Sequence, residues 1–241
     1  MAPTSAVPDG AYSEGRLYAR PQPPSAAPTI APGLHTLLFP NGRETLFYAP
    51  GHVSAQGAPL LLLLHGAGRR DGGAEATALG HAMLHGAFLL APRALDTSWD
   101  LLRGGYGPDL AFIDLLLSWT IQHYAIAPHG LAIGGFSDGA SYALSVGLAN
   151  GDLFGDVLAF SPGFARPLRI TGRPRVFIAH GAADAVLPVQ RGQDIARHLT
   201  AAGYEVEFQQ FDGAHTVPPQ VAIGALGRLG GAAPLSEGAP A

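Results

Sequence analysis

An unbroken apolar run, Pro59-Leu60-Leu61-Leu62-Leu63-Leu64, limits what this chain can fold into. A strand with one face toward water alternates apolar and polar residues, whereas a strand covered on both faces is apolar throughout. The run has the length of a strand and ends at His65-Gly66, so we predict a central strand buried between two layers. Such strands are typical of parallel sheets with helices on both faces.

The rest of the chain continues this pattern of strands and helices. Residues 34–39 and 44–49 flank Asn41-Gly42, which predicts an antiparallel hairpin. Further strands are predicted at residues 87–91, 130–134, 156–161, 175–180 and 205–211, and helices at residues 74–84, 109–124, 140–149, 190–202 and 219–229. Strands that alternate with helices predict an α/β fold with a mostly parallel sheet and right-handed crossovers.

The length of 241 residues suits one such domain. Hydrophobic residues make up 47% of the chain and charged residues 13%, which favours a globular protein. We expect a flexible Pro- and Ala-rich leader over residues 1–32, the α/β domain over 33–229 and a flexible tail over 230–241. Tyr12, Leu17 and Tyr18 are the leader residues able to pack on the domain.

Charge and cysteine content exclude several classes of function. The formal net charge is -4 and no basic run occurs, so nucleic-acid binding has no electrostatic support. Cysteine is absent, which excludes disulfides, thiolate metal sites and a cysteine nucleophile. No stretch has the pattern of a signal peptide or a transmembrane helix. We therefore expect a cytoplasmic protein with no integral membrane segment.

The pentapeptide Gly135-Phe136-Ser137-Asp138-Gly139 lies between a predicted strand and a predicted helix. A turn this tight strains its central residue and crowds the residues two before and two after it. These flanking residues must therefore be small. Glycine at 135 and 139 meets that requirement and leaves Ser137 accessible. A bare G-x-S-x-G match arises by chance in a chain with 33 glycines. The flanking strand and helix favour the interpretation that Ser137 is a nucleophile.

Two more polar residues, Asp184 and His215, follow later strands. The carboxyl ends of parallel strands meet at one edge of a sheet, so both should lie near Ser137. We expect His215 to take the serine proton and Asp184 to orient the imidazole. Asp184 competes with Asp212 for this role and is otherwise a turn residue or helix cap. A lone histidine among ten is more often structural, so the interpretation depends on all three residues together.

The backbone N–H of Asp138, just after the serine, is the expected first oxyanion donor, and that of Ala67 is the expected second. The Asp138 carboxylate has no assigned task beyond that of a first-turn acid. Four residues in loops at the same edge are candidates for a substrate pocket or for ordinary packing: Trp99, Tyr106, Phe164 and Leu187. His81 and His85 have i, i+4 spacing but lack a third ligand, so we expect no metal site.

Several segments together resemble the phospholipase/carboxylesterase family of small α/β-hydrolases, which includes acyl-protein thioesterases. They are His65-Gly66-Ala67-Gly68, Ala91-Pro92-Arg93, Ser98-Trp99-Asp100, Gly135–Gly139, His180–Pro188 and Gly213-Ala214-His215. The resemblance covers about residues 34–229 and implies an α/β-hydrolase catalytic domain. It implies Ser137, Asp184 and His215 as the triad, the amides of Ala67 and Asp138 as the oxyanion hole, and no metal or cofactor. Acyl-protein thioesterases usually carry Gln where this chain has Asp138.

We therefore expect a serine hydrolase that cleaves small carboxylic esters, and thioesters remain open. One alternative is a serine peptidase or amidase on the same fold, although 241 residues cannot hold the propeller domain usual in oligopeptidases. The other alternative is a non-catalytic hydrolase-fold protein that binds a small ligand. Hydrolases of this size often form homodimers, so a homodimer is one arrangement that the sequence allows.

Overall fold

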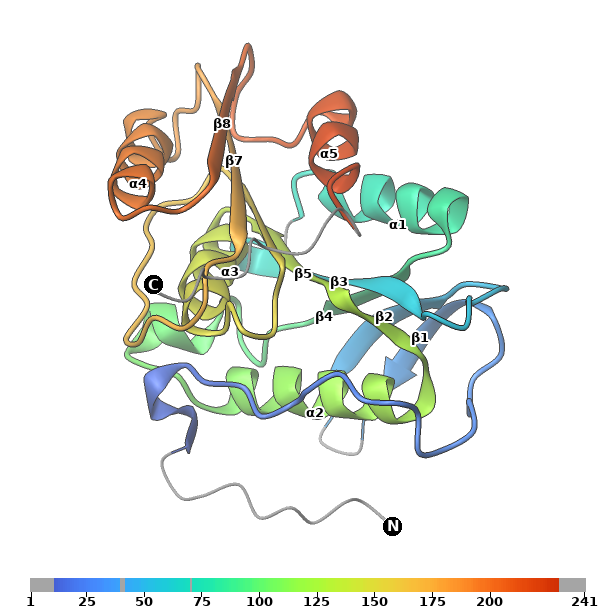
Figure 1. The fold of residues 1–241 in the computed structure, drawn as a ribbon. Coiled ribbons are helices and arrows are strands. Elements are labelled where there is room, and N and C mark those ends of the chain that lie inside the picture. Colours follow the sequence, from blue (N-terminus) through green and yellow to red (C-terminus); the bar gives the residue numbers. More distant parts are fainter. Residues whose placement is uncertain (1–10, 40–41, 70, 230–241) are drawn as a thin grey trace, which may run out of the picture.

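The computed structural model describes residues 11–39, 42–69 and 71–229. Within these ranges an eight-stranded sheet in the order β1-β2-β4-β3-β5-β6-β7-β8 forms the centre of the molecule (Figure 1). The strands are β1 (Gly33–Leu38), β2 (Glu44–Ala49), β3 (Ala58–Leu64), β4 (Phe88–Pro92), β5 (Ile126–Phe136), β6 (Asp156–Phe160), β7 (Arg175–Gly181) and β8 (Val206–Phe211). The pairs β1–β2 and β2–β4 are antiparallel, and the other pairs are parallel.

Helices cover both faces of this sheet (Figure 1). The α-helices are α1 (Ala74–His85), α2 (Pro108–His123), α3 (Asp138–Ala149), α4 (Gln190–Ala201) and α5 (Pro219–Leu226), and the short 3-10 helices are η1 (Ala11–Glu14), η2 (Ala67–Arg69) and η3 (Asp100–Arg103). One core lies between the sheet and α2, α3 and α4, and the other lies between the sheet and α1 and α5. The predicted mostly parallel sheet with two helical layers is confirmed.

The leucines of β3 show why the chain needs both layers. Leu60, Leu62 and Leu64 belong to the core under α2 and α3, whereas Leu61 and Leu63 belong to the core under α1 and α5. All five side chains are buried. Because side chains alternate between the faces of a strand, an unbroken apolar run requires an apolar layer on each side.

Strand β5 is longer than predicted, because it begins at Ile126 rather than Gly130. Ala58 of β3 pairs with Ile126 and Leu60 pairs with Leu131, so the register shifts between these two pairs. The shift accommodates Pro128, which has no N–H to donate to a neighbouring strand. The sequence pattern located the apolar half of this strand and missed the half that contains Pro128 and His129.

Part of residues 11–32 packs against the domain, as the sequence analysis allowed for Tyr12 and Leu17. Leu17 is 1% exposed, and its N–H donates to Asn150 Oδ1 over 2.8 Å. The N–H groups of Tyr18 and Ala19 donate to Asp114 Oδ1 over 2.7 and 2.8 Å. The segment runs along α2 (Figure 1). Residues 1–10 of the predicted leader and the predicted tail 230–241 lie outside the described residues.

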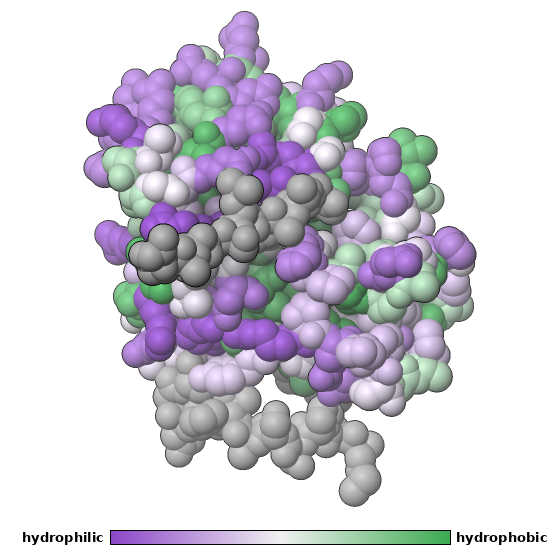
Figure 2. Space-filling model, in the orientation of Figure 1, coloured by the Kyte–Doolittle hydropathy of each residue, from purple (hydrophilic) through white to green (hydrophobic). Residues whose placement is uncertain are grey.

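The surface is mixed in polarity, and the face shown in Figure 2 is mostly hydrophilic with apolar residues between. No helix in the described part of the chain is long and apolar enough to cross a bilayer.

Replacing Leu17 with alanine tests whether the N-terminal segment belongs to the fold. Leu17→Ala removes a buried side chain, so we expect the free energy of unfolding to fall by about 2–4 kcal/mol. Leu38→Ala is the matched control, because Leu38 is 71% exposed and its loss should cost less than about 0.5 kcal/mol. Urea unfolding measures both. Equal effects of the two substitutions would contradict the packing of this segment.

Candidate active site

The sharp turn between β5 and α3 holds Ser137 in an unusual backbone conformation. Its φ is 55° and its ψ is −115°, outside the regions that non-glycine residues normally adopt. A Cβ added to Gly135 would lie 2.5 Å from the carbonyl carbon of Gly139. A Cβ added to Gly139 would overlap the carbonyl oxygens of Leu64 and His65. The two glycines of the pentapeptide therefore allow the turn to pack directly on the end of β3.

The structure brings Ser137, His215 and Asp184 into one hydrogen-bonded chain. His215 Nε2 lies 2.9 Å from Ser137 Oγ, and His215 Nδ1 lies 2.6 Å from Asp184 Oδ2. Ser137 and Asp184 are each 7% exposed, and the His215 side chain is 15% exposed. Asp212, the alternative acid, is exposed. The three predicted residues thus meet at the edge of the sheet with geometry suited to proton transfer from serine to histidine.

The loops after β7 and β8 lie against each other, and this contact brings Asp184 to His215. Ala182 N–H donates to Phe211 O over 2.8 Å, and Ala183 N–H donates to Gly213 O over 2.9 Å. On the other side of the imidazole, the Phe136 ring packs with its centroid 4.6 Å from that of His215. His215 is therefore held between a backbone-paired loop and an aromatic side chain.

The Asp184 carboxylate accepts several hydrogen bonds that favour its ionised form. Oδ1 accepts the N–H groups of Val186 and Leu187 over 2.9 and 2.8 Å. Burial alone would raise the pKa of Asp184, but the hydrogen bonds from His215, Leu187 and Val186 together outweigh it and hold the pKa below its ordinary value of 3.8. Asp184 is therefore an anion at neutral pH, as required of a group that orients an imidazolium.

Sequence analysis missed the contact that His180 makes with this carboxylate. His180 is fully buried, and its Nε2–H donates to Leu187 O over 2.8 Å and lies 3.3 Å from Asp184 Oδ2. The His180 imidazole therefore stabilises both the Asp184 carboxylate and the turn that follows it. The signal in the sequence was the His180-Gly181 pair that precedes the aspartate by a few residues.

The loop after β3 is fixed against the serine by buried hydrogen bonds. Trp99 Nε1–H donates to His65 O over 2.8 Å. His65 Nδ1 donates to Gly66 O, and its Nε2 accepts the N–H of Ala94 over 2.9 Å. Burial is the largest cause that lowers the pKa of His65, so the ring is neutral, as these two bonds require. His65 is thus a structural residue that positions the backbone leading to Ala67.

Two amides are the candidates for an oxyanion hole, those of Ala67 and Asp138. Asp138 is the first residue of α3 and Ala67 is the first residue of η2. Within the described ranges, neither N–H donates to another protein group. Free amides at such positions can stabilise an anionic oxygen. The Asp138 carboxylate, which had no assigned task, accepts a hydrogen bond from Ser98 Oγ over 2.6 Å.

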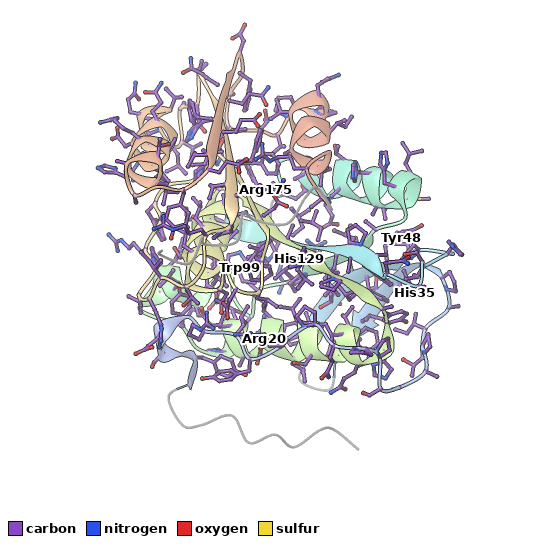
Figure 3. All side chains as sticks on the ribbon, viewed as in Figure 1. Arg20, His35, Tyr48, Trp99, His129 and Arg175 are labelled. Carbon is purple, nitrogen blue, oxygen red and sulfur yellow. The ribbon has the colours of Figure 1, made fainter. Side chains whose placement is uncertain are left out.

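The four candidates for a substrate pocket differ in their burial. Trp99, labelled in Figure 3, is fully buried, and its ring centroid lies 4.9 Å from that of His65 and 5.3 Å from that of Tyr142, so it serves packing, the alternative that the sequence left open. Tyr106 also packs on Tyr142, with centroids 5.8 Å apart.

Phe164 and Leu187 are partly exposed, as is Tyr106. The Leu187 methyl groups lie about 3.6 Å from the position that a Cβ on Gly163 would take. The N–H of Gly163 in turn donates to Ser141 Oγ, one helical turn beyond Ser137. Phe164, Leu187 and Tyr106 therefore remain the candidates for contact with a substrate.

The two histidines of α1 pack on each other. The rings of His81 and His85 lie 4.3 Å apart, and burial lowers the pKa of His81. No group of three or more His, Cys, Asp or Glu side chains suited to a metal occurs among the described residues.

A mostly parallel sheet with a serine after β5, an aspartate after β7 and a histidine after β8 defines an α/β-hydrolase fold. The model of the phospholipase/carboxylesterase family matches residues 111–223, which confirms the resemblance that the sequence motifs indicated. Acyl-protein thioesterase 1 of Gibberella zeae is 28% identical over 105 residues. That match covers 39% of this chain and 45% of the relative, so it spans less than half of the relative's length. The family match supports an enzyme of the hydrolase class.

Solved structures share the fold. Esterase PE8 is 23% identical with a TM-score of 0.57, covering 82% of this chain and 97% of its own. Poly(aspartic acid) hydrolase-1 from Sphingomonas sp. KT-1 is 16% identical with a TM-score of 0.66, covering 83% and 99%. Zea mays acyl-protein thioesterase 2 is 19% identical with a TM-score of 0.55, covering 76% and 96%. At these identities the likeness shows the fold alone.

Substituting Gly139 tests the packing of the serine turn. Gly139→Ala places a methyl group against the Leu64 and His65 carbonyls, so we expect a loss of about 2–3 kcal/mol in the free energy of unfolding. Gly80→Ala, in the exposed part of α1 with no atom near its added Cβ, should instead stabilise the protein by about 0.4–1 kcal/mol. Urea unfolding of both variants compares them, and a Gly139→Ala protein as stable as the wild type contradicts the crowding.

The hydrogen bonds to Asp184 predict a pH-dependent contribution to stability. A carboxyl group with a lowered folded pKa stabilises the fold above its unfolded pKa, and this contribution disappears as the pH falls through the folded pKa. We therefore expect the wild type to be more stable than Asp184→Asn at pH 6, and the difference to shrink below about pH 4. Urea unfolding across this range measures it, with Asp212→Asn in the exposed neighbouring loop as the control. A difference that grows toward low pH would contradict the assignment.

Proposed function

We propose that this protein hydrolyses carboxylic esters through an acyl-enzyme intermediate on Ser137. The observation that carries the proposal is the hydrogen-bonded chain from Ser137 Oγ through the His215 imidazole to Asp184. In the first step His215 Nε2 accepts the hydroxyl proton while Oγ attacks the substrate carbonyl. The imidazolium then gives that proton to the leaving oxygen, and an acyl-serine remains.

The second step repeats the chemistry with water. His215 takes a proton from a water molecule, which attacks the acyl carbon, and the proton then returns to Ser137 Oγ as the acid leaves. In both steps negative charge develops on the carbonyl oxygen, and the free amides of Ala67 and Asp138 are the proposed donors to it. The α3 N-terminus adds a favourable dipole at the same place.

The comparisons support an ester or thioester as the substrate, because the similar proteins include an esterase and acyl-protein thioesterases. The same step releases a thiol in place of an alcohol, so thioesters remain within the proposal. The peptidase alternative uses the same side chains and is separated from it by comparing amide with ester substrates. The hydrogen-bonded chain of all three side chains weighs against the non-catalytic alternative, since binding alone does not require it.

Covalent labelling and substitution test the proposal directly. We expect a fluorophosphonate probe to label the wild type, and Ser137→Ala to lose the label and to hydrolyse 4-nitrophenyl butyrate at least about 10⁴-fold more slowly. Asp184→Asn should reduce turnover by about 10³–10⁴-fold, because the imidazole loses its orienting anion. Ser161→Ala is the matched control, since Ser161 is another buried serine with positive φ at the end of a neighbouring strand. Unchanged ester hydrolysis in Ser137→Ala would exclude the mechanism.

A further inference from the structure

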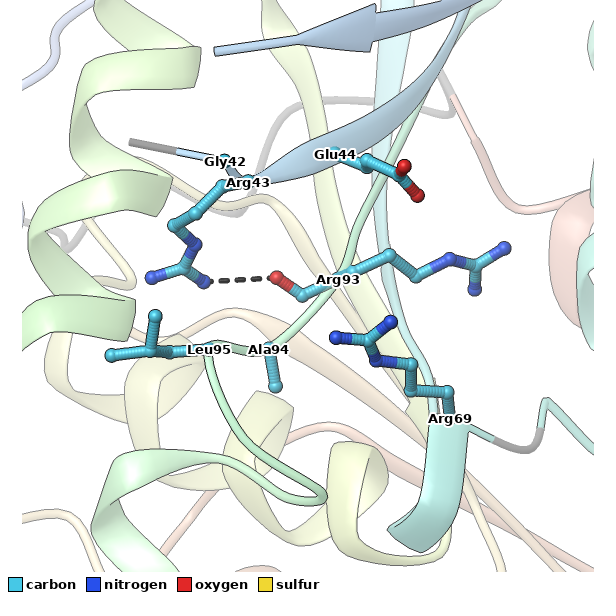
Figure 4. A pocket seen from close by; sticks show the side chains of 7 residues that line it. All are labelled: Gly42, Arg43, Glu44, Arg69, Arg93, Ala94 and Leu95. Carbon is cyan, nitrogen blue, oxygen red and sulfur yellow. Dashed lines mark hydrogen bonds between the residues drawn. The ribbon is translucent and has the colours of Figure 1, made fainter. Parts of the chain in front are cut away.

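Two adjoining cavities lie beside the loop that follows β3. One, of about 290 Å³, is lined by Gly68, Arg69, Leu95, Asp96 and Thr97. The other, of about 130 Å³, is lined by Gly42, Arg43, Glu44, Arg69, Arg93, Ala94 and Leu95 (Figure 4). Arg69 and Leu95 line both, so the Arg69 side chain stands where the cavities meet.

Both walls of the larger cavity continue into the proposed reaction centre. Gly68 directly follows Ala67, the proposed oxyanion donor. On the opposite wall, Thr97 directly precedes Ser98, whose hydroxyl donates to the carboxylate of Asp138. The N–H of Gly68 donates to Thr97 O over 2.7 Å and joins the two walls. The larger cavity therefore adjoins the two loops that carry Ala67 and Ser98.

Among the residues that the structure describes, Arg69 is the cation at this junction without an ionic partner. Arg43 pairs with Asp109 over 2.5 Å, and Arg93 pairs with Glu75 over 2.9 Å. For Arg69, no carboxylate within ion-pair distance is found in the part of the chain that the structure describes. Its side chain points from η2 toward Arg93 and Ala94, which line the smaller cavity with it (Figure 4).

The acidic groups of the cavities limit where an anion can bind. Asp96, in the larger cavity, is paired with Arg103 over 2.6 Å. Glu44 lies at the far end of the smaller cavity, on the opposite side from η2 (Figure 4). Its charge repels an anion placed there and favours one close to Arg69. The positive charges of Arg93 and Arg69 also act on the loop after β3. Burial lowers the pKa of His65, and these two charges lower it further.

The backbone of Arg69 is strained as well. Among the described residues, the non-glycine residues with positive φ are Arg69, Ser137 and Ser161, and Arg69 has a φ of 61°. A left-handed conformation disfavours any residue with a Cβ, and such residues cluster at functional sites.

We infer that Arg69 binds a carboxylate carried by the ester substrate, so that the enzyme prefers esters with one negative charge near the scissile bond. The inference rests on the proposed esterase function and adds a substrate class to it. A planar guanidinium pairs with a carboxylate through two parallel hydrogen bonds, which gives orientation as well as attraction. Arg69, which has no ionic partner among the described residues, supplies that fork beside a space large enough for a short chain.

Paired substrates test the inference on either side of the scissile bond. Mono-4-nitrophenyl adipate and neutral 4-nitrophenyl heptanoate probe a carboxylate on the acyl side, and 4-acetoxybenzoate and neutral 4-acetylphenyl acetate probe one on the leaving group. In Arg69→Gln we expect kcat/KM for at least one anionic ester to fall about fivefold to twentyfold, with its neutral counterpart changed less than about twofold. Arg69→Lys should retain part of the preference, because it keeps the charge but not the planar fork.

Arg197→Gln is the matched control, since it removes one exposed positive charge from α4 and should leave both ratios unchanged. Raising the salt concentration should reduce the anionic preference of the wild type and leave that of Arg69→Gln unaltered. Fluorophosphonate labelling of Ser137 reports the proposed function separately. A labelled Arg69→Gln enzyme with the same anionic-to-neutral ratios as the wild type overturns the inference and leaves the esterase proposal standing.

Discussion

The close backbone contact between the end of β3 and the start of α3 is the constraint on which the rest of the site depends. Gly139 lies against the carbonyl groups of Leu64 and His65, at a distance that no side chain allows. This contact holds Ser137 in its strained conformation and brings the loop containing Ala67 beside it. Strain of this kind persists only where the surrounding structure enforces it, and here the apolar layers on both faces of β3 do so.

Most of this architecture could be predicted from the sequence, because it depends on patterns along the chain. The run Leu60–Leu64 specified a strand between two layers, and the glycines around Ser137 specified the turn. The contacts that were missed join residues far apart in sequence. The residues around Leu17 in the sequence do not indicate that it packs against α2 and bonds to Asn150. Likewise, the residues around Asp138 do not indicate that its carboxylate accepts a hydrogen bond from Ser98.

Trp99 illustrates the same limit within the site. A tryptophan in a loop at the active edge suits a pocket wall or a packing anchor equally well by sequence. The outcome was decided by His65, whose carbonyl accepts the indole N–H, and by Tyr142, on which the ring packs. His65 was expected to bring the backbone close to the site, and its two ring hydrogen bonds explain how it does so. The sequence pattern thus predicted where Trp99 and His65 lie, and their side-chain contacts determine what each of them does.

The long connection between β4 and α2 has little regular structure, yet buried charges order it. Asp109 accepts hydrogen bonds from Arg43, from Leu95 N–H and from Asp100 N–H. Asp100 accepts the N–H of Gly107 and the hydroxyl of Tyr142, and burial raises its pKa despite these bonds. Removing one member would leave a buried charge uncompensated, so the network keeps a single arrangement. Because this loop carries Ser98 and one wall of the cavity at Arg69, the network also fixes the start of that wall, through the bond from Leu95 N–H to Asp109.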